Sequence, residues 1–128
     1  MSLLEKYLAK AEQEVERKTE VVLIDGDEWS VRSLTFEEER KCYKLAEDKE
    51  GNFDGFRYND VRLVKCTEHA FPWNHPELLK KYRAADKYEL PVKLFNDNRA
   101  AYRELLAAVR RVNADIKTEA ETMDELKN

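Results

Sequence analysis

The spacing of hydrophobic and polar positions predicts an N-terminal helix. The stretch Ser2-Leu3-Leu4-Glu5 has the Ser-x-x-Glu form of a capping box, which satisfies free backbone N–H groups at a helix start. Apolar residues then recur at steps of three and four, with Tyr7 beside them: Leu4, Leu8, Ala11 and Val15. This period indicates an amphipathic helix to about Arg17. Its apolar stripe is narrow, so we expect it to dock on the body of the protein or on a partner.

A β-hairpin is predicted next. Residues 19–24 are rich in β-branched side chains, Asp25-Gly26 is a strong two-residue turn signal, and residues 28–34 alternate between polar and apolar. The alternation places Trp29 and Val31 on one face. Because an isolated hairpin is only marginally stable in water, this face is expected to pack on helices.

Two helices are expected after the hairpin. Thr35-Phe36-Glu37-Glu38 repeats the capping-box pattern and opens a helix to about Glu50. We expect that helix to bury Phe36, Tyr43 and Ala46. The glycines and Asx residues of segment 51–55 predict a loop. A helix with Asn59 as its N-cap then runs to Pro72, and its apolar stripe contains Leu63, Val64, Thr67, Ala70 and Phe71.

The C-terminal half is expected to hold shorter helices and one long one. Pro76 suits the first turn of a helix that buries Leu78, Leu79 and Tyr82. A brief helix containing Leu90, Leu94 and Phe95 follows. The helix 98–113 has the best 3.6-residue stripe of the chain and is expected at the centre of the fold, through Ala101, Tyr102, Leu105, Leu106, Val109 and Val112.

Together these elements predict an α+β fold that is predominantly helical: an N-terminal helix, one β-hairpin and a compact bundle of about four to five short helices. We expect residues 1–128 to form a single domain. Its ends, residues 1–18 and 117–128, are weakly anchored in this interpretation and can reposition. The final segment has weak helical character, with Ala120, Met123 and Leu126 on one side.

Composition and charge narrow the class of protein. The chain has 128 residues, 42% of them hydrophobic and 39% charged, with a net charge of −4. The apolar share argues against disorder, and the longest apolar run, Leu105 to Val109, is far too short for a transmembrane helix. Cys42 and Cys66 lack the spacing of a disulfide framework, so we expect buried or half-buried thiols in a reducing, cytosolic compartment.

No arrangement of residues predicts catalysis or a metal site. His69 and His75 cannot share a helix face, and no Cys or acidic residue stands at zinc-site spacing beside them. Asp25, Asp27 and Glu28 are expected to solvate the hairpin turn. Phosphate-binding and nucleophile motifs are also missing from the sequence. We therefore expect a protein with no catalytic residues, no cofactor and no metal.

Two kinds of binding protein remain. One side of helix 98–113 carries four arginines that could neutralise phosphates: Arg99, Arg103, Arg110 and Arg111. Four arginines in an acidic protein are few, and aromatic residues are not interleaved with them as stacking platforms would be. We therefore favour a solvated arginine face, no nucleic acid and no membrane partner. An adaptor or nucleic-acid-binding module using this face is the alternative to a protein that grips a helical partner through apolar stripes.

The order of the motifs resembles one family, the XkdN-like tail assembly chaperones of long-tailed bacteriophages. The resemblance covers nearly the whole chain. Its motifs are Met1-Ser2-Leu3-Leu4-Glu5-Lys6, the Val-Val-Leu-Ile strand, the Trp-x-Val-Arg-x-Leu-Thr strand leading to Glu37-Glu38-Glu39, Phe56-Arg57-Tyr58-Asn59, Phe71-Pro72, Pro76-Glu77-Leu78-Leu79-Lys80-Lys81-Tyr82, the leucine-bearing helices and the ending Glu125-Leu126-Lys127-Asn128.

The resemblance implies a small non-enzymatic factor in the cytoplasm of the bacterial host. Such a factor binds the long tape measure protein and keeps it soluble until tail tube subunits polymerise around it, which makes the tail tube protein a further partner. It is not expected in the mature virion. Weak anchoring with a retained apolar stripe suits a reversible grip on a client, so the expected partner-binding residues are Leu4, Tyr7, Leu8, Met123 and Leu126.

Overall fold

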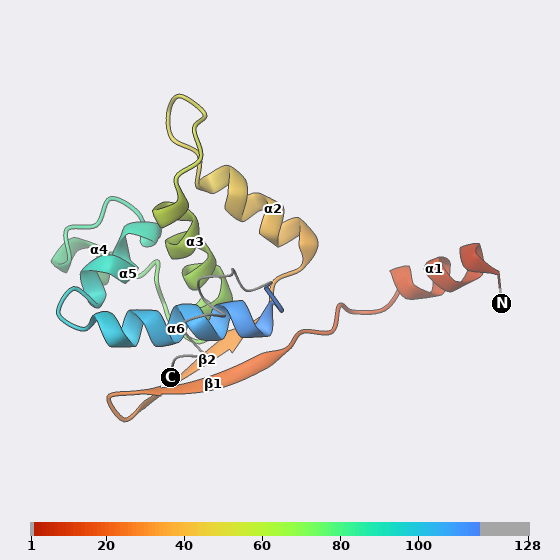
Figure 1. Cartoon of the computed structure of the whole chain (residues 1–128), viewed down its shortest axis with the longest axis horizontal. Helices are drawn as coiled ribbons and strands as arrows, with labels where there is room; N and C mark the ends of the chain where they lie inside the picture. The colour runs from red at the N-terminus through yellow and green to blue at the C-terminus, as the bar shows by residue number, and fades with distance from the viewer. Residues whose placement is uncertain (1, 116–128) are drawn as a thin grey trace, which may run out of the picture.

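An N-terminal helix, a two-stranded antiparallel hairpin and a set of short helices follow one another along the chain, which confirms the predicted α+β, mostly helical fold class (Figure 1). The computed structural model describes residues 2–115. The elements are α1 (Leu3–Ala11), β1 (Thr19–Ile24), β2 (Asp27–Arg32), α2 (Phe36–Leu45), α3 (Gly55–Thr67), α4 (Pro76–Lys81), the 3₁₀ helix η1 (Lys87–Glu89), α5 (Leu90–Leu94) and α6 (Arg99–Val112).

The hairpin forms where the sequence predicts it. Asp25 and Gly26 both have positive φ, at 52° and 84°, as a type I′ turn requires. This turn sets an antiparallel register in which Val22 lies opposite Trp29. The inner face of the hairpin is buried and contacts α3 and α6, with Val31 fully buried. The hairpin therefore packs on helices, as expected.

Helix α6 lies along the hairpin and against α3 (Figure 1). It begins at the predicted cap, where the Asn98 side chain accepts a hydrogen bond from the Ala101 N–H at 3.2 Å. Five of the six predicted stripe residues are buried, namely Ala101, Leu105, Leu106, Val109 and Val112, whereas Tyr102 is half-buried; Ala108 is buried as well. The same stripe contacts both the hairpin and α3, which confirms the central place expected for this helix.

Helix α3 begins five residues earlier than predicted. The Asp54 side chain, and not that of Asn59, caps it by accepting hydrogen bonds from the N–H groups of Phe56 and Arg57, at 3.0 and 3.2 Å. The helix also ends earlier, at Thr67. A following turn, in which the Phe71 N–H donates to the Thr67 carbonyl, redirects the chain toward Trp73. Pro76 behaves as expected, since α4 begins at this residue, whereas Pro72 lies beyond the end of α3 and does not terminate it.

Aromatic side chains join the hairpin to the segment after α3. The Trp29 ring lies 4.9 Å from Phe71, 6.0 Å from Trp73 and 5.7 Å from Phe95, measured between ring centroids. Trp73 is buried, and its indole N–H donates to Thr67 Oγ1 at 2.8 Å. The Thr67 hydroxyl donates in turn to the Leu63 carbonyl at 2.7 Å. The buried polar atoms of this cluster are therefore paired.

Two helices are shorter than predicted. Helix α1 ends at Ala11 and not near Arg17, because the acidic residues that follow oppose the negative end of the helix dipole. Helix α2 ends at Leu45 and not near Glu50. There the Asp48 carboxylate accepts hydrogen bonds from the N–H groups of Glu50 and Asn52, and Gly51 adopts a φ of 81°, which together form a turn.

The expected burial of α2 is wrong for two of three residues. Ala46 is fully buried, but Phe36 is 75% exposed and Tyr43 is 50% exposed. The buried side of α2 is centred on Cys42 and Ala46, and Tyr43 lies at its edge, where its ring packs on Tyr58 of α3. The sequence therefore predicted the helical period of α2 correctly, but it did not predict which face of α2 is turned toward the core.

The first prediction tests the core of α6. Leu105 is fully buried, so Leu105→Asp places an unpaired charge among apolar side chains and should cost several kcal/mol, enough to unfold the protein. Thermal unfolding followed by circular dichroism measures this. Glu104→Asp introduces the same side chain at the exposed neighbouring position and should melt like the wild type. A cooperative melt of Leu105→Asp at the wild-type temperature would contradict the packing.

The second prediction concerns Asp60, which ties α3 to α6. The Tyr102 hydroxyl donates to Asp60 Oδ1 at 2.6 Å, and the carboxylate is only 9% exposed. Burial raises the pKa of Asp60 to about 6, although the hydrogen bond from Tyr102 opposes this increase. The native state therefore binds the Asp60 proton more tightly than the unfolded chain, and the contribution of Asp60 to stability falls as the pH rises from about 4 to 6.

Asp60→Asn removes this titration and keeps an oxygen that can accept from Tyr102. We expect the stability of the variant relative to the wild type to increase between pH 4 and pH 7, by about 2 to 3 kcal/mol. Urea unfolding at several pH values measures the difference. A difference that stays constant over this range would show that Asp60 is not perturbed in the native state.

Candidate functional site

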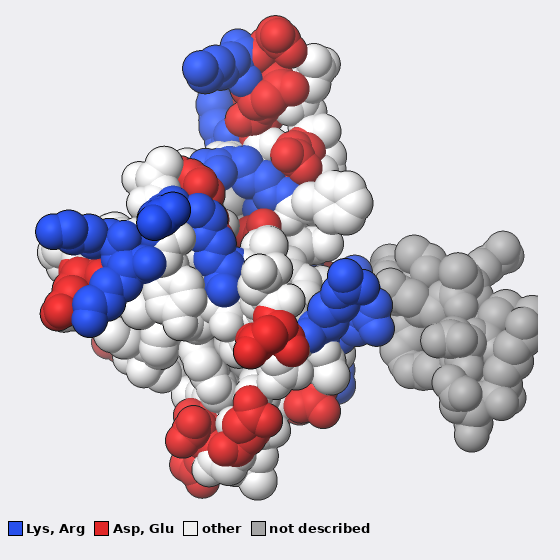
Figure 2. Space-filling view, turned by 90° about the vertical axis from the view of Figure 1, so that its left-hand side faces the viewer, with Lys and Arg blue, Asp and Glu red and all other residues white. Residues whose placement is uncertain are grey.

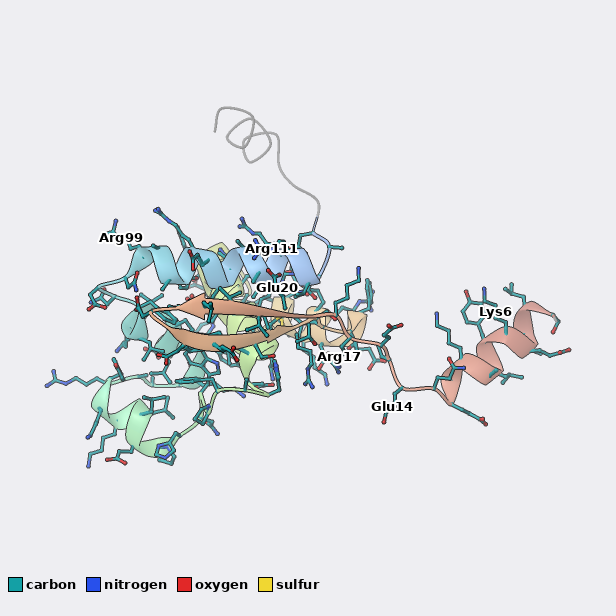
Figure 3. All side chains as sticks on the ribbon, turned by 90° about the horizontal axis from the view of Figure 1, so that it is seen from below. Lys6, Glu14, Arg17, Glu20, Arg99 and Arg111 are labelled. Carbon is teal, nitrogen blue, oxygen red and sulfur yellow. The ribbon has the colours of Figure 1, made fainter. Side chains whose placement is uncertain are left out.

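Helix α1 carries an apolar stripe that nothing in the described chain covers. Leu3, Leu4, Tyr7 and Leu8 lie on one face of the helix and are 71, 69, 55 and 61% exposed, and no residue of α1 is buried. The helix projects away from the rest of the molecule at the end of an extended segment (Figures 1 and 3). We call α1 and residues 12–16 the arm. Three of the expected partner-binding residues, Leu4, Tyr7 and Leu8, therefore share one exposed face.

The other two expected binding residues, Met123 and Leu126, lie outside the described residues. The three that are described could be found from the sequence because they recur at helical spacing. Their exposure could not, since periodicity does not show whether a stripe is covered.

The arm leaves the body at Arg17. The Arg17 guanidinium donates from Nη1 to the Ser33 carbonyl at 3.0 Å and to Glu38 Oε1 at 2.7 Å. Burial raises the pKa of Glu38, but the hydrogen bonds from Arg17 and Thr35 and the charge of Arg17 together outweigh this effect and leave the pKa below its ordinary value. The Lys18 N–H adds a bond to Ser33 Oγ at 2.9 Å. These contacts fix the base of the arm beside the first turn of α2 (Figure 3).

A groove of about 530 Å³ opens beside that base, between α2, α3 and the C-terminal end of α6. We call it the α2–α3 groove, and its lining residues are Leu34, Thr35, Phe36, Glu39, Tyr43, Tyr58, Arg62, Asn113 and Asp115. Aromatic rings form much of one wall. The Tyr43 centroid lies 4.5 Å from that of Tyr58 and 5.3 Å from that of Phe53. Sequence reasoning missed this groove because it assigned Phe36 and Tyr43 to the core.

Arg62 forms the floor of the groove and joins three elements. Its Nη1 and Nη2 atoms donate to the two carboxylate oxygens of Asp115 at 2.7 and 2.9 Å. Its Nε lies 3.0 Å from Glu39 Oε1 as an ion pair, without the alignment of a hydrogen bond. Burial lowers the pKa of Arg62, but the bonds to Asp115 and the charge of Glu39 raise it by more. The guanidinium stays charged and holds α2, α3 and the end of α6 together.

Tyr58 completes this network. Its hydroxyl donates to Glu39 Oε1, and its ring lies 5.4 Å from the Arg62 guanidinium. Burial, followed by the hydrogen bond to Glu39, raises the pKa of Tyr58 above its ordinary value. The phenol therefore stays protonated and serves as a donor at neutral pH. The polar atoms at the floor are used in structure, and the exposed part of the groove is mainly aromatic.

The arginine side of α6 does not form one uniform basic surface. Arg111 donates from Nη2 to Glu20 Oε1 at 2.7 Å, and its Nε lies 3.1 Å from both oxygens of the same carboxylate. Arg99 lies at the opposite end of the helix (Figure 3), where it lines a separate hollow of about 360 Å³ with Arg103. Acidic side chains gather at the bottom of Figure 2, below the helices, on the side where the hairpin turn lies.

The histidines and cysteines take structural positions. Both thiols are free and buried, and burial raises the pKa of Cys42 to about 12 and that of Cys66 to about 11. His69 lies just after α3, with Nε2 2.9 Å from Ser30 Oγ. Burial, followed by the charge of Arg32, lowers the pKa of His69. Among residues 2–115, no cluster of three or more His, Cys, Asp or Glu side chains has the arrangement of a metal site.

The search for similar proteins gives a likeness of fold. No protein-family model matches the chain, and none of the curated proteins matches it. A crystal structure of the protein YqbN superposes on it with a TM-score of 0.62 at 17% sequence identity, over 81% of this chain and 91% of that one. At this identity the likeness shows a shared fold and nothing of function. Within the described part of the chain, no helix has the length and apolar character needed to cross a membrane.

The third prediction tests the floor of the groove. Arg62→Met leaves the carboxylates of Glu39 and Asp115 without their shared cation, and we expect a loss of about 2 to 3 kcal/mol in the free energy of unfolding. Urea unfolding measures the loss. Arg111→Met breaks an exposed pair in the same way and should cost less than about 1 kcal/mol. Equal losses in the two variants would contradict the structural role of Arg62.

Proposed function

We propose that this protein is a non-enzymatic tail assembly chaperone of a long-tailed bacteriophage. In this proposal it binds the tape measure protein in the cytoplasm of the bacterial host and keeps it soluble until the tail tube polymerises around it. The tail tube protein is then a further partner, and the chaperone is not retained in the mature virion. The motif order described above is what directs the proposal to this family.

The observation that carries the proposal is the uncovered stripe of α1. An amphipathic helix with no buried residue still has its whole apolar face available for a partner. Charged residues flank the stripe, because Lys6 and Lys10 place their ammonium groups 6.0 and 5.7 Å from the Tyr7 ring centroid. A helical client could place its own apolar face against such a stripe and leave its polar face in water. This mode of binding needs neither cofactor nor catalytic residue.

The arm also allows α1 to contact a client at a distance from the body of the protein. Its base is fixed at Arg17, whereas residues 12–16 are exposed and separate α1 from the body. A helix that is tethered but not packed can bind along a long client without unfolding the core. The Arg111–Glu20 pair argues against the nucleic-acid alternative, because it neutralises one of the four arginines that would contact phosphates.

The fourth prediction tests client binding. Serine at all five expected positions, Leu4, Tyr7, Leu8, Met123 and Leu126, should leave the melting temperature within a few degrees of the wild type. The same variant should no longer copurify with the tape measure protein when the two are expressed together with the adjacent tail genes. The physical reason is that Leu4, Tyr7 and Leu8 are exposed, and exposed apolar side chains contribute little to folding but much to a helical contact.

A matched control is available on β1. Val21 and Leu23 are 56 and 67% exposed, close to the values of the arm residues, so Val21→Ser with Leu23→Ser removes two apolar side chains of comparable exposure elsewhere. This control should retain the client. If the five-position variant carries its client at wild-type yield, the contact does not involve the arm and the proposal fails for these residues.

A further inference from the structure

Within residues 2–115, two of the uncovered apolar surfaces have shapes that fit each other. One is the stripe of α1, and the other is the aromatic wall of the α2–α3 groove. Phe36 and Tyr43 on that wall are 75 and 50% exposed. A groove lined by aromatic rings is a shape that an amphipathic helix can fill, through side chains spaced at three and four residues. The chain therefore carries both halves of a helix-in-groove contact.

Charge also matches between the two surfaces. The exposed side of α2 carries three basic residues, Arg40, Lys41 and Lys44, and none of them forms an ion pair with another residue of segment 2–115. Arg40 lies over the Phe36 ring, 5.1 Å from its centroid, at the edge of the groove. The arm carries four acidic residues, Glu5, Glu12, Glu14 and Glu16, against two basic residues, Lys6 and Lys10, and is net negative. Opposite charges around an apolar contact set its orientation and its dependence on salt.

The arm does not fold back into the groove of its own chain in this structure, and its sequence explains why. Only residues 12–16 separate the end of α1 from the fixed Arg17, a span of at most about 18 Å. A sharp reversal needs turn residues such as Gly, Pro, Asn or Asp. Segment 12–16 has none of them, and Glu12, Glu14 and Glu16 repel one another and favour an extended chain.

We propose that two copies of the chain exchange their arms, with the α1 stripe of each copy lying in the α2–α3 groove of the other. The arrangement is closed and two-fold symmetric, because each copy gives one arm and receives one. Because the exchange is reciprocal, the dimer contains two arm-in-groove contacts and buries twice the surface area of one. A single nine-residue helix in a groove is a small contact, and two such contacts come closer to the roughly 1,200 Å² that the smaller specific complexes bury.

The inference concerns the chaperone without its client and does not rest on the proposed function. If the arm also binds a client, client and second copy compete for the same stripe. The purified full-length protein therefore provides the test with no client present, so that failure of this inference says nothing about client binding.

Sedimentation velocity over a range of protein concentrations measures the association. We expect the wild type to change from one copy of 15.1 kDa to two copies as the concentration rises. An arm variant, Leu4→Ser with Leu8→Ser, and a groove variant, Phe36→Ser with Tyr43→Ser, should each raise the dissociation constant by more than about a hundredfold. The exposed β1 control, Val21→Ser with Leu23→Ser, should associate like the wild type.

A second groove variant protects the test against loss of folding. Arg40→Glu with Lys44→Glu changes only exposed charges on α2 and should weaken the dimer while the melt stays cooperative. High salt should also weaken the association of the wild type, because it screens the same charges.

Three results would overturn the arm exchange. The first is a wild-type protein that stays monomeric at every concentration. This includes a monomer in which α1 lies in the groove of its own chain and its amides are therefore protected from hydrogen exchange. The second is a dimer that survives either the arm or the groove variant. The third is a dimer that is lost equally in the β1 control.

Discussion

The burial of α3 on nearly every side is the constraint on which the rest of the fold depends. The helix contacts α2, α5, α6, η1 and β2, so its buried polar side chains, Asp60, Arg62 and Thr67, have little access to water and need partners inside the protein. A different element supplies each partner. Tyr102 of α6 bonds to Asp60, Glu39 of α2 and Asp115 after α6 pair with Arg62, and Trp73 donates to Thr67. Each of these bonds therefore fixes the position of another segment against the central helix.

This arrangement completes the body without α1. The hairpin and α6 close the apolar core, the Trp29 cluster fills the end near Phe95, and Arg17 fixes the chain where it leaves the body. Nothing in the core then needs the stripe of α1 as a covering surface. The exposed arm and the exposed aromatic wall of α2 follow from the same cause, because the body turns only the Cys42 side of α2 inward.

The polar groups of the body are largely used in structure, which supports binding over catalysis as the proposed role. Arg62 forms an ion pair with Asp115, and Asp60 accepts a hydrogen bond from Tyr102. The Tyr58 phenol donates a hydrogen bond to Glu39. Burial raises the pKa of both cysteine thiols and so disfavours the reactive thiolate. By contrast, α1 and α2 carry apolar side chains that remain exposed on the surface. An exposed apolar patch that is flanked by charged side chains is suited to binding another helix.

The sequence by itself determined the elements whose causes are local. The Asp25-Gly26 turn needs only its own backbone, Pro76 suits a first helical turn, and the stripe of α6 is visible as a period. Only the tertiary structure decided which stripes are covered. Periodicity groups Phe36 with Tyr43 and Leu4 with Leu8, but burial depends on which other elements arrive at that face, and these come from distant parts of the chain. The groove was unpredictable for the same reason, since Asp115 and Glu39 meet at Arg62 only after α2, α3 and α6 have packed.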